Sequence, residues 1–268
     1  MGQQNEVPFG QFAFSIGYIR RIARHVSTAI TVLLCLIASL CALKNTAQAG
    51  QGYITAGFGG GPKALNSYQG IIYAPFGSLS ETGLILRAWN KAFRFSYETS
   101  LQRTMNVPIS ALGLSIEAEV GWQYVHSKGR YGLYGGLVWR DHLLTPTDPN
   151  STLTKSRIGF SATVEAQHTI TEDFGISESV NYIQGINQYW AQIRPYMMIE
   201  GSWKTGLDIA STGGEDYNTL HLGLFASDYE FSLWTGSRMY LGGQAGMQYS
   251  IRNKKISPYA GLHVGYLF

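Results

Sequence analysis

The residues that most suggest chemistry are Arg140, Asp141 and His142, which stand together before a loop over residues 145–150. An Asp beside a His can polarise a water molecule, as a hydrolase requires. However, neighbouring residues of a strand face opposite sides of the sheet, and Asp and Pro build turns. We therefore predict a structural loop motif without catalytic residues. The motif consists of Asp141, His142, Asp148, Pro149 and Asn150.

Three other polar patterns are weaker. His126 and Ser127 could belong to an esterase, but no orienting acid stands near them. The run Gly59–Lys63 lacks the Lys-Ser/Thr pair of a phosphate loop. The six histidines show no metal-ligand spacing. We accordingly predict no enzyme, no metal and no cofactor, with a hydrolase kept as the alternative.

The segments that carry these residues alternate with period 2. Every even position from Leu112 to Tyr124 is apolar or aromatic, whereas the odd positions hold Gly, Ser, Glu or Gln. Residues 131–140 and 157–167 repeat the pattern. A period of 2 indicates strands, and runs of this length exceed the ordinary ~5–6 residues. Strands of about 9–11 residues or more can cross a bilayer at a tilt.

Similar segments recur along the chain and predict about 12 strands, with ten as the alternative. Two places fit the pattern poorly. Glu178 shares the parity of the apolar residues around it, and residues 84–97 change phase, for which we expect a bulge. Connections after even-numbered strands are expected to be short, and those near Asn66, Arg103 and 145–151 longer. The predicted strands are roughly 52–59, 67–76, 82–97, 107–126, 130–143, 154–170, 174–186, 188–200, 202–210, 217–227, 229–250 and 256–268.

The first 49 residues differ from the rest. Three arginines precede an uncharged apolar run over residues 27–43, and small residues follow at Ala47 and Ala49. This pattern predicts a signal peptide over residues 1–49 that is cleaved before Gly50, with a membrane anchor as the alternative. The leader holds both cysteines, four of the 20 Lys and Arg residues and one of the 17 Asp and Glu residues. The remaining 16 cations and 16 anions balance, so we predict no nucleic-acid partner.

We therefore predict that residues 50–268 form one all-β domain, and several features favour a membrane barrel over a soluble sandwich. Only 14% of the chain is charged, against about 25% in a typical soluble domain. Lipid offers no hydrogen bonds, so the sheet must close on itself. Its final strand ends in an alternating aromatic pattern that we interpret as an assembly signal for barrel insertion. That signal consists of Leu262, Val264, Tyr266 and Phe268.

In such an antiparallel, up-and-down barrel the apolar side chains face lipid, and the polar side chains must point inward. Opposite charges could pair there or meet water. The residues that we expect to line the interior are Arg87, Glu117, Glu119, Arg140, Arg157, Glu165 and Arg194.

Five segments resemble the BcsS family of alphaproteobacterial cellulose biosynthesis proteins. They are Arg140–Leu143, Asp148–Asn150 with the Arg157 strand, Gln188–Ala191, Gly83–Arg87 and the glycine-rich first strand. The similarity extends from about Gly52 to Phe268. It implies an outer-membrane barrel associated with cellulose production or export, and it carries no catalytic residues over.

We therefore expect a non-catalytic outer-membrane barrel that assists biosynthesis or export of cellulose or a related exopolysaccharide. It would act as a passage or as an accessory of the synthase complex. The alternatives are an outer-membrane hydrolase acting on lipid A or polysaccharide, and a structural barrel or small porin. The expected partners are outer-membrane lipid, the barrel-assembly machinery, the cellulose synthase complex and the glucan chain, after export through the general secretory pathway.

Overall fold

The computed structural model describes residues 50–62, 64–101, 104–149, 151, 153, 156–200, 203–214, 217–232, 238–252 and 254–268. The expected signal peptide, with Ala47 and Ala49, lies outside these residues, as does Asn150. Within the described part of the chain, no helix is long and apolar enough to cross a membrane.

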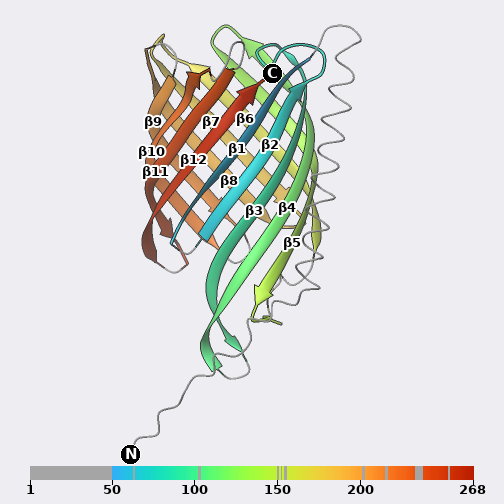
Figure 1. Cartoon of the computed structure of the whole chain (residues 1–268), viewed down its shortest axis with the longest axis vertical. Helices are drawn as coiled ribbons and strands as arrows, with labels where there is room; N and C mark the ends of the chain where they lie inside the picture. The colour runs from blue at the N-terminus through green and yellow to red at the C-terminus, as the bar shows by residue number, and fades with distance from the viewer. Residues whose placement is uncertain are drawn as a thin grey trace, which may run out of the picture. The chain divides into compact units, whose positions relative to one another are not determined.

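Twelve antiparallel strands close into a barrel, as predicted (Figure 1). Each strand pairs with its neighbours in sequence, and β1 closes the barrel by pairing with β12, where Tyr53 lies opposite Leu267. The strands are β1 (Gln51–Gly61), β2 (Ala64–Ala74), β3 (Gly83–Leu101), β4 (Thr104–His126), β5 (Gly129–Thr145), β6 (Arg157–Thr169), β7 (Phe174–Gln184), β8 (Gln188–Ile199), β9 (Trp203–Gly213), β10 (Asn218–Phe231), β11 (Arg238–Ser250) and β12 (Lys255–Leu267).

Side-chain exposure follows the predicted alternation. On β4, Val120 and Trp122 are 52% and 58% exposed, whereas Glu117 and Glu119 on the opposite face are 2% and 5% exposed. Exposed apolar side chains also cover the outer faces of the other strands, for example Leu133 on β5. An apolar outer band around a polar interior is the arrangement of an outer-membrane barrel.

The expected bulge in residues 84–97 is absent. The register between β3 and β4 runs without interruption from Gly83 to Thr99. The hydrophobic pattern changes phase because β3 carries aromatic rings on its inner face as well as apolar residues on its outer face. These inner rings are Trp89, Phe93, Phe95 and Tyr97.

The expected strand boundary between residues 217–227 and 229–250 is also wrong. Strand β10 continues to Phe231, and its register with β11 shifts between Ala226 and Tyr229. Asp228 has a φ of 63°, a left-handed conformation that Asp adopts more readily than most residues. The polar residue therefore marks a bulge inside a strand.

The connections after odd-numbered strands are not uniformly longer. The segment 146–156 is long, but β1 and β2 are separated only by residues 62–63, and Asn66 lies within β2. Length is instead added to three strands: β3, β4 and β5 have 19, 23 and 17 residues, and the others have 11–14. In Figure 1 these three strands continue past their neighbours at the end opposite the carboxy terminus.

We call that end the distal end, and we call the part of β3, β4 and β5 beyond their neighbours the extension. The extension has a small core of its own, formed by Ile109, Ala111 and Leu144. Phe95, Tyr97 and Leu153 pack against this core. The extension is thus an ordered continuation of the barrel wall.

Candidate functional site: the polar interior of the barrel

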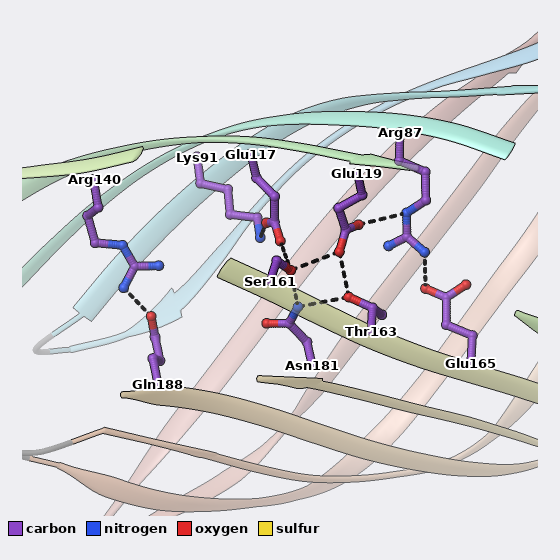
Figure 2. A network of polar contacts seen from close by, with 10 residues as sticks. All are labelled: Arg87, Lys91, Glu117, Glu119, Arg140, Ser161, Thr163, Glu165, Asn181 and Gln188. Atoms are coloured by element: carbon purple, nitrogen blue, oxygen red, sulfur yellow. Dashed lines mark hydrogen bonds and ion pairs between the residues drawn. The ribbon is translucent and has the colours of Figure 1, made fainter. Parts of the chain in front are cut away.

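The inner faces of β3, β4 and β6 hold a network of ion pairs (Figure 2). Arg87 Nε lies 3.2 Å from Glu119 Oε2, and Arg87 Nη1 lies 2.8 Å from Glu165 Oε1. Lys91 Nζ lies 2.7 Å from Glu117 Oε2. The Arg87, Glu117 and Glu119 side chains are almost excluded from solvent. Buried charges of this kind are tolerated because each has a partner of opposite sign.

Hydroxyl and amide groups extend the network to β7. Ser161 Oγ lies 2.6 Å from Glu117 Oε1 and 2.8 Å from Glu119 Oε1, so its proton can be shared between the two carboxylates. Thr163 donates to Glu119 Oε1 at 2.7 Å. Asn181 on β7 donates to both hydroxyl oxygens, at 2.9 and 2.8 Å. The carboxylates are therefore held by directed hydrogen bonds as well as by charge.

Gly136 allows this network to cross β5. It lies between Glu119 on β4 and Ser161 on β6 in the strand register. A Cβ at this position would stand 1.9 Å from the carbonyl oxygen of Ala118. Because Gly136 has no side chain, Ser161 reaches Glu119 over the intervening strand.

Aromatic rings line the wall beside the network. The Arg87 guanidinium lies 4.2 Å from the ring centre of Tyr134 and 5.5 Å from that of Trp89. Trp89 in turn lies over Gly70 of β2, where a Cβ would be 2.1 Å from the ring. The rings thus lie along the wall, over strand positions that carry no side chain.

Arg140 stands apart from the main network, as Figure 2 shows. It is 8% exposed and donates through Nη1 to Gln188 of β8, and its guanidinium lies 5.3 Å from the ring centre of Phe93. Its Nε has no hydrogen-bond partner in the described part of the chain, and neither has Ser115 Oγ. Ser115 is 1% exposed and lies opposite Arg140 on β4. Two buried polar atoms are thus unsatisfied at one level of the interior, which costs free energy unless a ligand or water supplies a partner.

A second network joins β8, β9, β11 and β12. Asp208 is 1% exposed and its Oδ1 accepts from Arg194 Nε at 2.8 Å and from Gln192 Nε2 at 2.6 Å. Tyr259 donates to the other oxygen of Asp208 at 2.8 Å. Arg194 also donates to Gln244 of β11.

Sequence reasoning missed several members of these networks. Asp208 alternates with outward-facing Leu207 and Ile209, so the period-2 pattern was sufficient to find it. Lys91 was hidden by the change of phase in β3. Gln188 and Tyr259 are uncharged, and no local signal distinguishes them from other polar strand residues.

The structure separates the residues of the loop motif. On β5 the inner face carries Arg140 and His142, and Asp141 points outward, where it accepts from Ser156 Oγ at 2.9 Å. His142 meets the Phe93 ring at a centroid distance of 5.4 Å. Asp148 is 3% exposed and accepts from Tyr97 at 3.1 Å, whereas Pro149 is exposed.

The remaining expected site residues lie as follows. Arg157 lies opposite Arg140 in the register of β5 and β6. Leu262, Val264 and Tyr266 lie on the outer face of β12. The Leu262 and Tyr266 side chains are 53% and 37% exposed. Phe268 exchanges backbone hydrogen bonds with Gly52, at 2.8 and 2.9 Å.

Within the described residues, His126 and the other histidines do not assemble into a catalytic or metal site. His126 is stacked between Tyr124 and Tyr131, with ring centroids 5.8 and 5.5 Å away. Its Nδ1 accepts from the backbone N–H of Lys128 at 3.2 Å. Among the described residues, no group of three or more His, Cys, Asp or Glu could hold a metal ion.

Comparison with solved structures identifies the fold. An outer membrane channel from Pseudomonas putida F1 superposes with a TM-score of 0.50 and 10% identity, covering 83% of this chain and 97% of that chain. The toluene transporter TodX of Pseudomonas putida superposes with a TM-score of 0.50 and 9% identity, covering 82% of this chain and 90% of that chain. The KdgM porin superposes with a TM-score of 0.47 and 9% identity, covering 80% of this chain and 98% of that chain. These neighbours are channels and transporters.

Comparison of the sequence found no match among curated proteins. It did match one protein family over residues 56–268, nearly the whole barrel. This agrees with the resemblance noted in the sequence. The chain belongs to the family described as cellulose biosynthesis protein BcsS.

Proposed function

We propose that this barrel is a non-catalytic outer-membrane component of cellulose or related exopolysaccharide production, and that it serves as a passage for the polymer. The family supports the link to cellulose. The passage rests on one observation: most interior ion pairs and rings run along the wall between nearby strands. The Arg87–Glu119 pair on β3 and β4 is an example.

The flat placement of the aromatic rings supports the same proposal. Tyr68 lies over Gly57 and Trp89 lies over Gly70, each beside its neighbouring strand. A ring that lies along the wall takes less of the interior than one that projects across it. A 12-stranded barrel is intermediate between packed eight-stranded barrels and porins with 16 or more strands.

The opposite orientations of Asp141 and His142 favour a non-catalytic role. A general base must be within hydrogen-bond reach of its partner, and these two side chains lie on different faces of β5. His126 makes ring contacts and accepts a backbone hydrogen bond.

The proposal includes a route and an orientation. Residues 1–49 would direct the chain through the general secretory pathway and be cleaved after Ala49. The assembly machinery would recognise the strand that ends with Tyr266 and Phe268. The distal end would face outward, so that the other end meets the periplasm and any synthase complex.

Deletion of the gene tests this function. The measurement is extracellular β-glucan in the deletion strain and its parent, with the amount of synthase determined in both. We expect extracellular polymer to fall at least tenfold while synthase persists, and a plasmid copy to restore it. Unchanged extracellular polymer would contradict any role in cellulose production.

A further inference from the structure

A row of aromatic rings leads along the inner face of β3 into the extension. Phe93 and Phe95 have centroids 6.3 Å apart and planes 17° apart. Phe95 and Tyr97 are 6.2 Å apart, with planes 27° apart. The rings are thus nearly parallel and evenly spaced. All three are partly buried, and Phe95 and Tyr97 also pack against the core of the extension.

Two contacts hold the row in place. Phe93 lies over Gly113 of β4, where a Cβ would stand 2.1 Å from the ring. At the other end of the row, Tyr97 donates to the buried Asp148 at 3.1 Å. The orientation of the rings is therefore set before any ligand arrives, which lowers the cost of binding.

Polar groups with unused hydrogen-bonding capacity lie beside the first ring. Arg140 lies over Phe93 and donates to Gln188, which donates in turn to Tyr217. Arg140 Nε and Ser115 Oγ have no partner within the described residues, although both side chains are more than nine-tenths buried. Both atoms are shut off from solvent, so a ligand would reach them only after Arg140 or Ser115 changes rotamer. A hydroxyl group could then bond to either atom, since a hydroxyl donates and accepts.

An extended β-linked glucan combines the two features that this surface complements. The faces of its sugar rings carry C–H groups that pack on aromatic rings, and its edges carry hydroxyls. We propose that the inner face of β3 and its polar neighbours form a binding track for a neutral β-linked glucan chain. The track consists of Phe93, Phe95, Tyr97, Arg140 and Gln188.

This assignment rests on the proposed function and names the surface that would contact the polymer. A neutral ligand is favoured because the charges of the neighbouring network are paired, although the track itself includes the Arg140 guanidinium, whose hydrogen-bond partner Gln188 is neutral. Arg87 pairs with Glu119 and Glu165, and Lys91 pairs with Glu117. The aromatic row itself carries no charge.

The test is calorimetric titration of the processed chain, purified from outer membranes in detergent, with cellohexaose. Phe93→Leu keeps an apolar side chain but removes the flat ring, and Arg140→Gln removes the guanidinium. We expect each variant to bind cellohexaose about tenfold more weakly or worse, equivalent to about 1.4 kcal/mol. The matched control is Phe160→Leu on the outer face, where Phe160 is 66% exposed. The affinity of Phe160→Leu for cellohexaose should be within about twofold of that of the unmodified protein.

Unfolding by denaturant is measured for each variant, so that lost binding is scored only for folded protein. Equal binding by Phe93→Leu and the unmodified chain would overturn the proposal. So would binding of hexagalacturonate in preference to cellohexaose, or the absence of cellohexaose binding.

The deletion strain separates this proposal from the proposed function. If deletion abolishes extracellular glucan but the barrel does not bind cellohexaose, the function stands and the track is wrong. If the barrel binds cellohexaose through Phe93 but deletion leaves glucan unchanged, the track stands and the function is wrong.

Discussion

Arg87 Nε on β3 lies 3.2 Å from Glu119 Oε2 on β4, directly across the strand pair, and both side chains are nearly excluded from solvent. Glu119 also accepts from Ser161 and Thr163 of β6. One carboxylate therefore connects groups from three strands of the wall. Removing its charge leaves Arg87 with Glu165 as its remaining ion-pair partner.

Glu119→Gln should accordingly lower the free energy of unfolding by about 3–5 kcal/mol, the usual cost of removing one charged partner from a buried ion pair. The measurement is denaturant unfolding of the barrel in lipid vesicles. Glu230→Gln is the control, because Glu230 is 48% exposed and lies 4.0 Å from Arg238. We expect the control to change by less than about 1 kcal/mol. Equal effects of the two substitutions would contradict a stabilising role for the network.

Gly136→Ala should destabilise the barrel by about 1–3 kcal/mol, the typical cost of overpacking. The added Cβ would meet the carbonyl oxygen of Ala118 at 1.9 Å, which β4 cannot relieve by rotating a side chain. Gly135→Ala on the outer face is the matched control, since its nearest neighbour would be 3.8 Å away. The same unfolding assay compares the two. A harmless Gly136→Ala would show that β4 and β5 do not approach as closely as described.

Leu137→Arg tests the apolar outer band. Leu137 is 53% exposed on the outer face of β5, and an arginine facing the middle of the bilayer costs about 2–4 kcal/mol. We expect that loss of unfolding free energy in vesicles. Glu98→Arg, on the exposed outer face of the extension, should change it by less than about 0.5 kcal/mol. If Leu137→Arg left the free energy of unfolding unchanged, the outer face of β5 at Leu137 would not contact the bilayer interior.

Asp141→Asn should leave extracellular β-glucan unchanged. Asp141 points outward and accepts a hydrogen bond from the exposed Ser156, so the substitution removes only a surface interaction. The assay compares the deletion strain carrying the variant with the same strain carrying the unmodified gene, at equal amounts of barrel. A large loss of polymer in the Asp141→Asn strain would favour the hydrolase alternative.

Local pattern explains most of the fold that sequence reasoning could predict. Alternation from Leu112 to Tyr124 predicted which face of β4 is apolar, and the structure has that arrangement. The same rule failed on β3, because its inner face carries aromatic rings such as Phe93. It misplaced the end of β10, because Asp228 marks a bulge there.

The partners of the interior residues were beyond sequence reasoning for a different reason. Arg87 and Glu165 belong to β3 and β6, and their contact depends on the register of every strand between them. Arg140 and Gln188 are likewise three strands apart, on β5 and β8. Alternation shows that a side chain points inward, but only barrel closure determines which side chains it meets.

The most direct test of a passage is the location of newly made β-glucan in a strain that lacks this chain but retains its synthase. Pulse-labelled polymer is measured separately in the periplasm and in the medium, with the complemented strain as the control. A passage predicts that labelled polymer accumulates in the periplasm as it disappears from the medium. Loss of polymer from both compartments would instead indicate an accessory of the synthase complex and contradict the passage.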